Sequence, residues 1–403
     1  MKVLLISQYY KPEPVFYPTE VAEHFALNGH NVTVITSHPN YPKGKFYDNF
    51  TWWKPVASVE NGVRVIRLPI FPDHSDSKIR RFLNYSSFAI VAFFASFFIG
   101  IRPNLVWVYQ TPFTNALGGL WFKKLFGSKV IFFYADLWPE SFLAASILRQ
   151  GFLIKALYFY RSWINKKADY IFTITNGMRL RYLQDGLAEN SIESIPLWIE
   201  KSTAEIRELS NKIERDFSKI VYVGNIGPSQ QLEILIEAAS LLKHMDKDFS
   251  VQIYGSGTDL EKLRKMTREF KLSNVFFNGT VSLSESVLIC SNSLAQFVHL
   301  RNSPMFEMTI PSKLIFSFYC GSPILCGLPG ESQKIAAESG ASYIFEPGNP
   351  ASLAAEIKMI LSANRIEIEK KGLAGRNFYQ KYYERIATLN QLVQKCEMLV
   401  NKI

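Results

Sequence analysis

The segment TIPSK places Lys313 in the first turn of an expected apolar helix, of which it is the only charge. Pro311 and Ser312 are favoured at the start of a helix, and Gly321 marks its expected end. The positive end of the helix dipole disfavours a cation here unless an anion is shared between the lysine and the free N–H groups of the first turn. A diphosphate is the obvious anion. The alternative is a solvated lysine that binds no ligand.

Three expected strands in the second half of the chain, YVG, IYG and FFNG, end in glycine-containing loops. Glycine lets a backbone approach a ligand closely, and the helix that follows supplies free N–H groups for phosphate oxygens. One such loop is weak support, since many strand-to-helix turns need glycine for packing. Three loops on one sheet edge predict a nucleotide pocket, with candidate residues Gly224, Gly227, Gly255, Gly257, Gly279 and Thr280.

The segment FYADLWPES in the first half ends an expected strand with Asp136 and begins a helix with Glu140. Carboxylates at such a position can orient sugar hydroxyls or accept a proton, which makes both catalytic candidates. The alternative is that Asp136 caps the helix and Glu140 complements its dipole. Asp136 is the stronger candidate. The aromatic loop from His38 to Trp53 is interpreted as an acceptor-binding lip.

No spacing typical of a metal site occurs among the six histidines and four cysteines. The acidic segment Asp246–Asp248 precedes an expected strand, on the wrong edge of its sheet, and is interpreted as a surface turn. We therefore expect no metal and no cofactor. Scattered cysteines are typical of reduced core residues in a cytosolic protein.

The elements that must position these residues alternate between strands and helices over 403 residues, enough for two domains. The runs of β-branched and aromatic residues are typical of parallel strands buried on both faces. The alternation predicts two doubly wound, Rossmann-like α/β domains, 1–199 and 200–375, followed by a helix, 376–403, that returns to the first domain. The expected strands are Val3–Tyr10, Val32–Ser37, Val63–Pro69, Leu105–Gln110, Val130–Leu137, Tyr170–Thr175, Ile192–Trp198 and six more in the second half.

Residues 82–101 form an uncharged segment that follows the basic cluster KIRR. The flanking strands belong to one sheet, so a membrane-spanning helix is not expected. Ala89, Ala92, Ser96 and Gly100 form a small-residue face for the sheet, while the phenylalanines point outward. We predict a helix that lies in a membrane surface, with KIRR at anionic head groups, which suits the net charge of +10. A fully buried helix is the alternative.

The chain resembles the retaining glycosyltransferase family four, which has the GT-B fold, and most of all its bacterial O-antigen and capsule branch. That branch includes proteins named as N-acetyl-L-fucosamine transferases. The resemblance covers nearly the whole chain. It rests on SQYYKPEP, GHNVTVITSHPNYPKG, DLWPES, ADYIFTITNGM, YVGNIGPSQQLEILIEAA, NVFFNGTV, TIPSKLIFSFYCGSPIL and GASYIFEPGNP, in that order.

The resemblance implies a cleft between an N-terminal acceptor domain and a C-terminal nucleotide-sugar domain. It implies front-face attack in which the leaving diphosphate helps to deprotonate the acceptor, without a metal or an enzyme nucleophile. The donor-site residues that it implies are a diphosphate loop at Gly224, Asn225 and Gly227, base neighbours at Gly279, Thr280 and Val281, phosphate and sugar contacts from Thr309 through Pro311 and Ser312 to Lys313, and Glu331 on the donor side.

Several positions depart from the family pattern. Asn225 and Gln230 stand where an arginine and a lysine are usual, and Met308 and Phe316 replace two glutamates. Ala135 stands where a histidine is often found. Lys313, helped by Arg301, then becomes the main cation for the diphosphate.

The predicted function is a retaining, metal-independent glycosyltransferase at the cytoplasmic face of the membrane. It would move a UDP-linked amino or deoxy sugar to a polyprenyl-diphosphate-linked saccharide in O-antigen or capsule biosynthesis. No nucleic-acid partner is expected. The alternatives are a nucleotide-sugar 2-epimerase of the same fold and a catalytically degenerate partner of a polysaccharide assembly complex.

Overall fold

The computed structural model describes residues 1–51, 53–73, 77–144, 151–210, 213–245 and 248–401. The chain forms two units, Met1–Ile195 with Ile386–Ile403, and Pro196–Arg385. We call them the N-terminal and the C-terminal unit. Residues 246 and 247 of the expected acidic turn lie outside the described residues.

In the described part of the N-terminal unit, eight strands form one sheet in the order β3-β4-β2-β1-β5-β6-β7-β8. Every neighbouring pair is parallel except β3 and β4, which are antiparallel. The central strands are buried along most of their length, as expected of a sheet covered on both faces. The strands are β1 (Lys2–Ile6), β2 (Asn31–Ser37), β3 (Val56–Glu60), β4 (Val63–Leu68), β5 (Leu105–Tyr109), β6 (Lys129–Tyr134), β7 (Tyr170–Thr173) and β8 (Ile192–Ser194).

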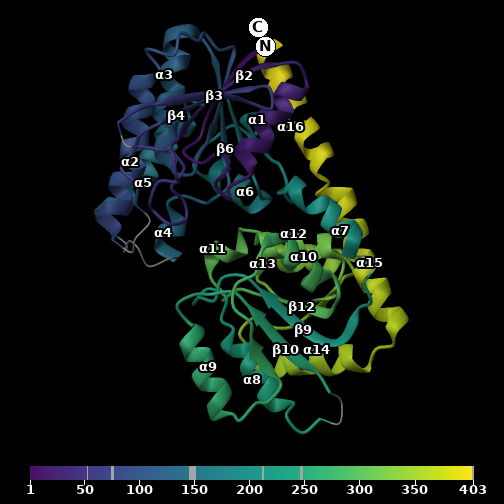
Figure 1. Ribbon diagram of the computed structural model, residues 1–403. Coiled ribbons are helices and arrows are strands. Elements are labelled where there is room, and N and C mark those ends of the chain that lie inside the picture. Colours follow the sequence, from purple (N-terminus) through teal and green to yellow (C-terminus); the bar gives the residue numbers. More distant parts are fainter. Residues whose placement is uncertain (52, 74–76, 145–150, 211–212, 246–247, 402–403) are drawn as a thin grey trace. The chain divides into compact units, whose positions relative to one another are not determined.

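Helices cover both faces of this sheet. Figure 1 shows α2, α3 and α5 on one side of it and α1 and α16 on the other. In the α1 and α16 layer, His30 Nε2 lies 2.9 Å from Glu397 Oε1, and His24 Nε2 lies 2.7 Å from Asn390 Oδ1. The helices are α1 (Tyr17–Leu27), α2 (Lys78–Ala95), η1 (Phe113–Asn115), α3 (Ala116–Phe126), α4 (Glu140–Ala144), α5 (Phe152–Asn165), α6 (Asn176–Gln184), η2 (Glu189–Ser191) and α16 (Arg385–Asn401).

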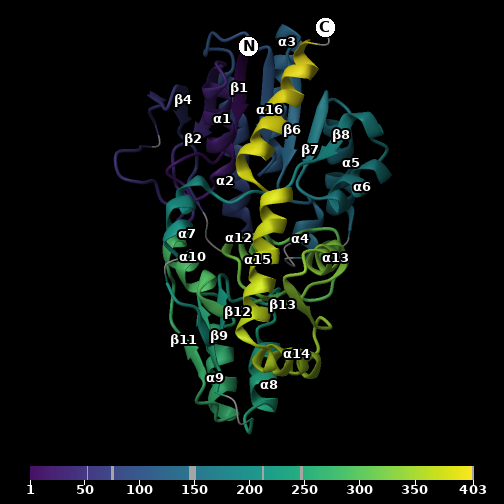
Figure 2. The same ribbon diagram turned by 90° about the vertical axis from the view of Figure 1, so that its right-hand side faces the viewer.

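The C-terminal unit has a parallel sheet of six described strands in the order β11-β10-β9-β12-β13-β14. Figure 2 shows α15 lying along this unit, where it packs against α12. The strands are β9 (Asp216–Val223), β10 (Ser250–Tyr254), β11 (Val275–Phe277), β12 (Ser293–His299), β13 (Ile324–Gly327) and β14 (Ser342–Ile344). The helices are η3 (Lys201–Thr203), α7 (Ala204–Ser210), α8 (Glu233–Leu241), α9 (Leu260–Glu269), α10 (Leu283–Ser291), α11 (Pro304–Glu307), α12 (Ser312–Cys320), α13 (Gly330–Glu338), α14 (Pro350–Ser362) and α15 (Arg365–Tyr382).

The two doubly wound α/β domains predicted from the sequence are confirmed. The expected strand Val3–Tyr10 was too long, since β1 ends at Ile6 and the chain then enters a buried loop. The edge strand β3 was not predicted. Its antiparallel pairing with β4 runs through the turn at Asn61 and Gly62, both of which have positive φ.

The apolar helix is α2, which begins and ends earlier than the predicted range 82–101. It includes KIRR and stops at Ala95, because the chain turns where the Ser96 hydroxyl donates to the Phe93 carbonyl at 2.5 Å. Its buried face carries Ala92 and Ser96, as predicted, together with Asn84 and Phe88. Within the described residues, no helix combines the length and the apolar character needed to cross a bilayer.

Candidate active site

The three glycine loops lie side by side at the carboxyl edge of the C-terminal sheet. The amide of Gly224 donates to the Tyr254 carbonyl at 2.9 Å, and that of Gly255 donates to the Gly279 carbonyl at 2.7 Å. A Cβ on Gly255 would stand 1.8 Å from the Gly224 carbonyl oxygen, and one on Gly257 would stand 2.0 Å from the Ile226 oxygen. Gly255 and Gly257 are thus required by loop-on-loop packing.

These loops surround a recess of about 440 Å³, a size typical of small-molecule sites. Five predicted donor-site residues line it, namely Gly224, Asn225, Gly255, Thr280 and Val281. Tyr254, Ser256 and Ser286 also line it and were not singled out from the sequence. The recess belongs to the C-terminal unit alone.

Lys313 lies against the first glycine loop. Its Nζ donates a hydrogen bond to the Tyr222 hydroxyl and lies 4.3 Å from the centroid of the same ring. The Tyr222 hydroxyl in turn donates to the Asn225 carbonyl. A Cβ on Gly224 would stand 2.4 Å from Lys313 Cε, so the glycine leaves the space that the lysine fills. The fold therefore brings TIPSK and the predicted diphosphate loop together.

The charge of Lys313 has no acidic counterpart in the part of the chain that the structure describes. Its contacts are a neutral hydroxyl and an aromatic face, and burial lowers the pKa of Lys313 to about 8. Burial raises the pKa of Tyr222, which stays neutral. Lys313 is the second residue of α12, whose N-cap is Pro311 and whose first-turn N–H groups receive no side-chain cap. Ser312, predicted at the start of the helix, is its first residue.

The segment before α12 lies beside the start of α13. The Ser332 hydroxyl donates to the Thr309 carbonyl at 2.8 Å. Gly330 has φ +63, and a Cβ there would stand 2.3 Å from the Glu307 carbonyl oxygen. These contacts bring Thr309 near the first turn of α13, where Glu331 lies half-buried.

The residues that replace the two family glutamates carry no charge. Met308 follows α11, and Phe316 packs on the cluster of Val221, Cys290 and Cys320. Neither position offers a carboxylate to a ligand.

His299, which ends β12, was missed by the sequence analysis. Its Nδ1 lies 2.9 Å from the Gln230 carbonyl, and the Gly348 amide donates to its Nε2 at 3.1 Å. This pair of partners fixes a neutral imidazole with the proton on Nδ1, and burial lowers the pKa of His299. The ring holds the turn that follows Gly227. The only sequence feature that could have pointed to His299 was its position at the end of an expected strand.

In the N-terminal unit, Asp136 follows β6 at the carboxyl edge of the sheet and is exposed. The Thr111 hydroxyl, which follows β5, donates to its Oδ2 at 3.4 Å. Neighbouring Gln110 is fully buried, and neither polar atom of its amide has a hydrogen-bond partner among the described residues. Asp136, Thr111 and Gln110 thus offer hydrogen-bonding groups to the hydroxyls of a ligand at this edge of the sheet.

Glu140 occupies a different environment. One of its oxygens lies 2.6 Å from Arg161 Nη1 and the other 3.1 Å from Arg181 Nε. Both arginines also pair with Asp185. Because both carboxylate oxygens are engaged by guanidinium groups, this arrangement favours a structural role over the predicted catalytic one.

Glu13, in the segment KPEP, was not singled out as a site residue. It is buried, and its carboxylate accepts hydrogen bonds from the amides of Asn40 and Tyr41, both at 2.8 Å, and of Tyr10 at 3.3 Å. Burial raises the pKa of Glu13 to about 7, although the three amides oppose the shift. Glu13 therefore joins the loop after β1 to the beginning of the predicted acceptor lip.

The described residues contain no group of three or more His, Cys, Asp or Glu side chains that could hold a metal ion. The four cysteines are buried and free.

Comparison with known proteins assigns both halves of the chain to domain families. A family described as a glycosyl transferase 4-like domain matches residues 14–198. A family described as glycosyl transferases group 1 matches residues 204–377.

Relatives extend over the whole chain. WcaI of Escherichia coli, named as a glycosyltransferase of colanic acid biosynthesis, is 29% identical over 420 residues, covering 98% of this chain and 99% of the relative. An uncharacterized glycosyltransferase of Methanocaldococcus jannaschii is 23% identical, covering 100% of this chain and 99% of the relative.

Solved structures share the fold. Sucrose-phosphate synthase of Thermosynechococcus elongatus has a TM-score of 0.76 at 17% identity and covers 100% of both chains. HepE of Anabaena, solved in complex with UDP, has a TM-score of 0.68 at 11% identity and covers 99% of this chain and 100% of its own. The GT-B architecture of two parallel-sheet domains is thus established for this chain.

Proposed function

Because this chain belongs to the glycosyltransferases that combine a 4-like domain with a group 1 domain, we propose that it builds a surface polysaccharide on a lipid carrier. It takes a sugar from a UDP-linked donor and transfers it, with retention, to a polyprenyl-diphosphate-linked saccharide. The names of its relatives support this class of pathway, since one is assigned to colanic acid biosynthesis and another to lipopolysaccharide. The UDP complexes of HepE support the nucleotide.

The observation that carries the proposal is the position of Lys313. A half-buried cation that lacks an acidic neighbour in the described chain lies at a helix start and against a glycine loop. An anion there is attracted both by the ammonium and by the first-turn N–H groups of α12. A diphosphate fits this arrangement.

The neighbouring loops take the other parts of the donor. The recess at Thr280 and Val281 accepts the base, and Glu331 faces the hydroxyls of the donor sugar. Asp136, in the N-terminal unit, binds the attacking hydroxyl of the acceptor. Glu140 has a structural role, since its ion pairs with Arg161 and Arg181 hold the segment that follows β6.

Transfer exchanges one bond for another at the anomeric carbon. The acceptor oxygen forms its bond on the face from which the diphosphate departs, so the configuration is retained. The acceptor proton passes to an oxygen of the leaving diphosphate. Negative charge grows on that group as its bond to the sugar breaks, and Lys313 stabilises the charge where it develops.

Two measurements on the purified full chain test the proposal. Thermal unfolding with a panel of nucleotide-sugars identifies the donor, and radiolabelled transfer to lipid-linked saccharides identifies the product. Lys313→Met should sharply reduce stabilisation by UDP, whereas Lys265→Met, on the exposed face of α9, should leave it unchanged. Equal stabilisation of the wild type and the Lys313 variant by UDP would remove the phosphate role.

One observation keeps a second function open. With Met308 and Phe316 in place of carboxylates, the chain could be a non-catalytic partner of a polysaccharide assembly complex. Donor binding without transfer to any acceptor would favour that function. Release of free epimerised donor would instead identify a 2-epimerase.

A further inference from the structure

Exposed apolar side chains gather on α2, α3 and α5, which lie on one face of the N-terminal sheet (Figure 1). Ile90 and Phe94 of α2 and Phe97, in the turn that follows this helix, are all exposed. On α5, Phe159 and Trp163 are exposed as well, and Phe159 is 75% exposed. We call this face the three-helix surface. Apolar surface of this extent is typical of an interaction site.

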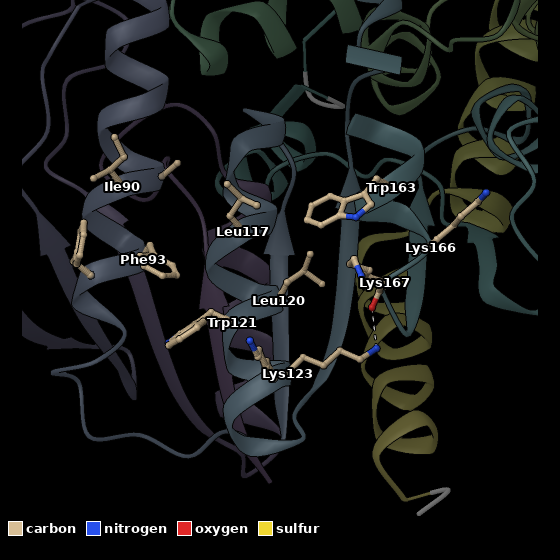
Figure 3. Close-up of a pocket in the computed structure, with 12 residues that line it drawn as sticks. Ile90, Phe93, Leu117, Leu120, Trp121, Lys123, Trp163, Lys166 and Lys167 are labelled. Carbon is tan, nitrogen blue, oxygen red and sulfur yellow. Dashed lines mark hydrogen bonds between the residues drawn. The ribbon is translucent and has the colours of Figure 1, made fainter. Parts of the chain in front are cut away.

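A groove of about 860 Å³ runs through the three-helix surface. Figure 3 shows Phe93 of α2, Leu117 and Leu120 of α3 and Trp163 of α5 around the same space. The ring of Trp121 packs on Phe93, with 5.2 Å between the ring centroids, which gives the groove a firm aromatic wall. Such a groove matches a flexible apolar chain.

Lysines close one end of the groove. Lys123 is held by Asp169 at 2.9 Å and by the Lys167 carbonyl at 2.8 Å. Lys124, Lys166 and Lys167 are exposed, and none of them forms an ion pair with a carboxylate of the described residues. Lys167 Nζ instead lies 5.1 Å from the centroid of the Trp163 ring, at the boundary between the charged and the apolar parts.

The two ends of the surface carry the same sign of charge. Because α2, α3 and α5 each connect parallel strands, they run in the same direction, with the start of α2 at the end of the surface opposite the lysines. That start carries KIRR. A two-fold dimer through this surface would bring lysines against lysines or lysines against KIRR, so a second copy is a poor occupant.

We propose that the groove binds an acyl chain of an anionic bilayer phospholipid, with its phosphate at Lys124, Lys166 and Lys167. Apolar helix faces insert at the boundary of head groups and acyl chains, while lysines extend to the phosphates. The sequence placed KIRR at the head groups. In the structure, Arg80 pairs with Asp73 at 2.8 Å, and the lysine cluster at the ends of α3 and α5 provides a second and unneutralised contact.

This inference rests on the proposed function only in that a lipid-linked acceptor explains why the protein would bind a membrane. Lipid binding itself requires no sugar and can be measured separately. The test is flotation of the full chain with vesicles of phosphatidylcholine alone or mixed equally with phosphatidylglycerol. The chain should bind the anionic vesicles and not the neutral ones. Replacing Lys124, Lys166 and Lys167 by Glu should weaken that binding by about a hundredfold or more, on the scale of about fivefold per cation lost.

The matched control carries the same change of charge elsewhere. Lys265, Lys334 and Lys358 are exposed in the C-terminal unit, and their replacement by Glu should reduce binding far less. Equal losses of vesicle binding in the two triple variants would show that only the net charge matters, and would overturn the lysine site. Equal binding of the wild type to neutral and anionic vesicles would also overturn it.

Occupancy of the groove has its own readout. Phosphatidylglycerol with brominated acyl chains should quench tryptophan fluorescence, and Trp121→Phe with Trp163→Phe should remove most of that quenching while the protein still floats with vesicles. Unchanged quenching would overturn the groove as the chain site. If the wild type were a dimer and the triple lysine variant a monomer, the occupant of the groove would be a second copy of the chain.

The triple lysine variant should still transfer sugar to a water-soluble acceptor. Loss of this activity would show that the lipid site and the proposed catalytic function are not separate.

Discussion

Two charges, the buried Glu13 and the half-buried Lys313, lie in different units and are satisfied in opposite ways. The carboxylate of Glu13 accepts hydrogen bonds from three backbone amides of its own unit. The ammonium of Lys313 donates to one neutral hydroxyl and lies against one aromatic ring. Burial moves both groups toward neutral pH, with a pKa of about 7 for Glu13 and about 8 for Lys313.

The difference separates a structural charge from one that awaits a ligand. A buried charge is costly unless the protein or a ligand compensates it. The amides around Glu13 belong to loops that the carboxylate holds, so its partner is the fold itself. Lys313 has no such partner in the described chain, and the missing anion is the donor diphosphate of our proposal.

The largest effect should come from Lys313→Met, which keeps the length of the side chain and removes its charge. Loss of one group that stabilises charge in the transition state typically slows a reaction by about a hundredfold to a thousandfold. Because the variant no longer buries an uncompensated ammonium, its melting temperature should be equal to or above that of the wild type. Transfer kinetics and calorimetry together test the comparison. A variant that transfers sugar normally, or that unfolds early, would show Lys313 to be structural.

Glu140→Gln extends the comparison to a third buried charge, which two arginines compensate. Removing one partner of a buried ion pair costs about 3 kcal/mol, so urea should unfold this variant well before the wild type. In the protein that remains folded, kcat should be unchanged. Loss of kcat in a folded sample would restore the catalytic role predicted from the sequence, and Glu189→Gln, at an exposed pair, is the control.

The sequence predicted what local patterns determine. Parallel strands were located because continuous apolar runs such as KVLLI are buried on both faces. The strand β3 was missed because its alternating residues lie at an edge and carry little of that signal. The three glycine loops were predicted to meet because the carboxyl ends of parallel strands share one edge.

What the sequence could not predict depends on side chains that meet from distant segments. Lys313 reaches Tyr222 and Gly224 across about ninety residues of chain. Glu13 could be recognised as a loop clamp only once the loops at Tyr10 and Asn40 were known to converge. The lysines of the groove come from the ends of two helices, and neither end is strongly basic alone.

The pH dependence of donor binding tests Lys313 with a smaller effect. Because burial lowers its pKa to about 8, from 10.5 for a free lysine, the ammonium is lost as the pH rises through 8. UDP affinity should therefore fall by up to about tenfold per pH unit above 8. The stability of the ligand-free protein has the opposite pH dependence. Because the unfolded chain binds this proton more tightly, stability is lost as the pH falls from 10.5 toward 8. Titration calorimetry of the Lys313→Met variant should show a flat profile, and parallel profiles in the two proteins would assign the pH effect to another group.

The smallest effect should come from Glu13→Gln, because an amide NH2 cannot accept the hydrogen bond that either oxygen of a carboxyl group, protonated or not, can accept from a backbone amide. The hydrogen bonds lost are worth about 1–2 kcal/mol, and donor binding should not change because the residue belongs to the other unit. The folded pKa of about 7 lies above the 4.5 of a free glutamate, so the stability that this group contributes is full below pH 4.5 and is lost as the pH rises through 7. The wild type should therefore exceed the variant most in melting temperature near pH 5 and least near pH 8. If the difference in melting temperature between wild type and variant instead widened with pH, the ionised carboxylate would be the favoured form. Its amides would then compensate the charge completely, and Glu13 would differ from Lys313 even more than their pKa values indicate.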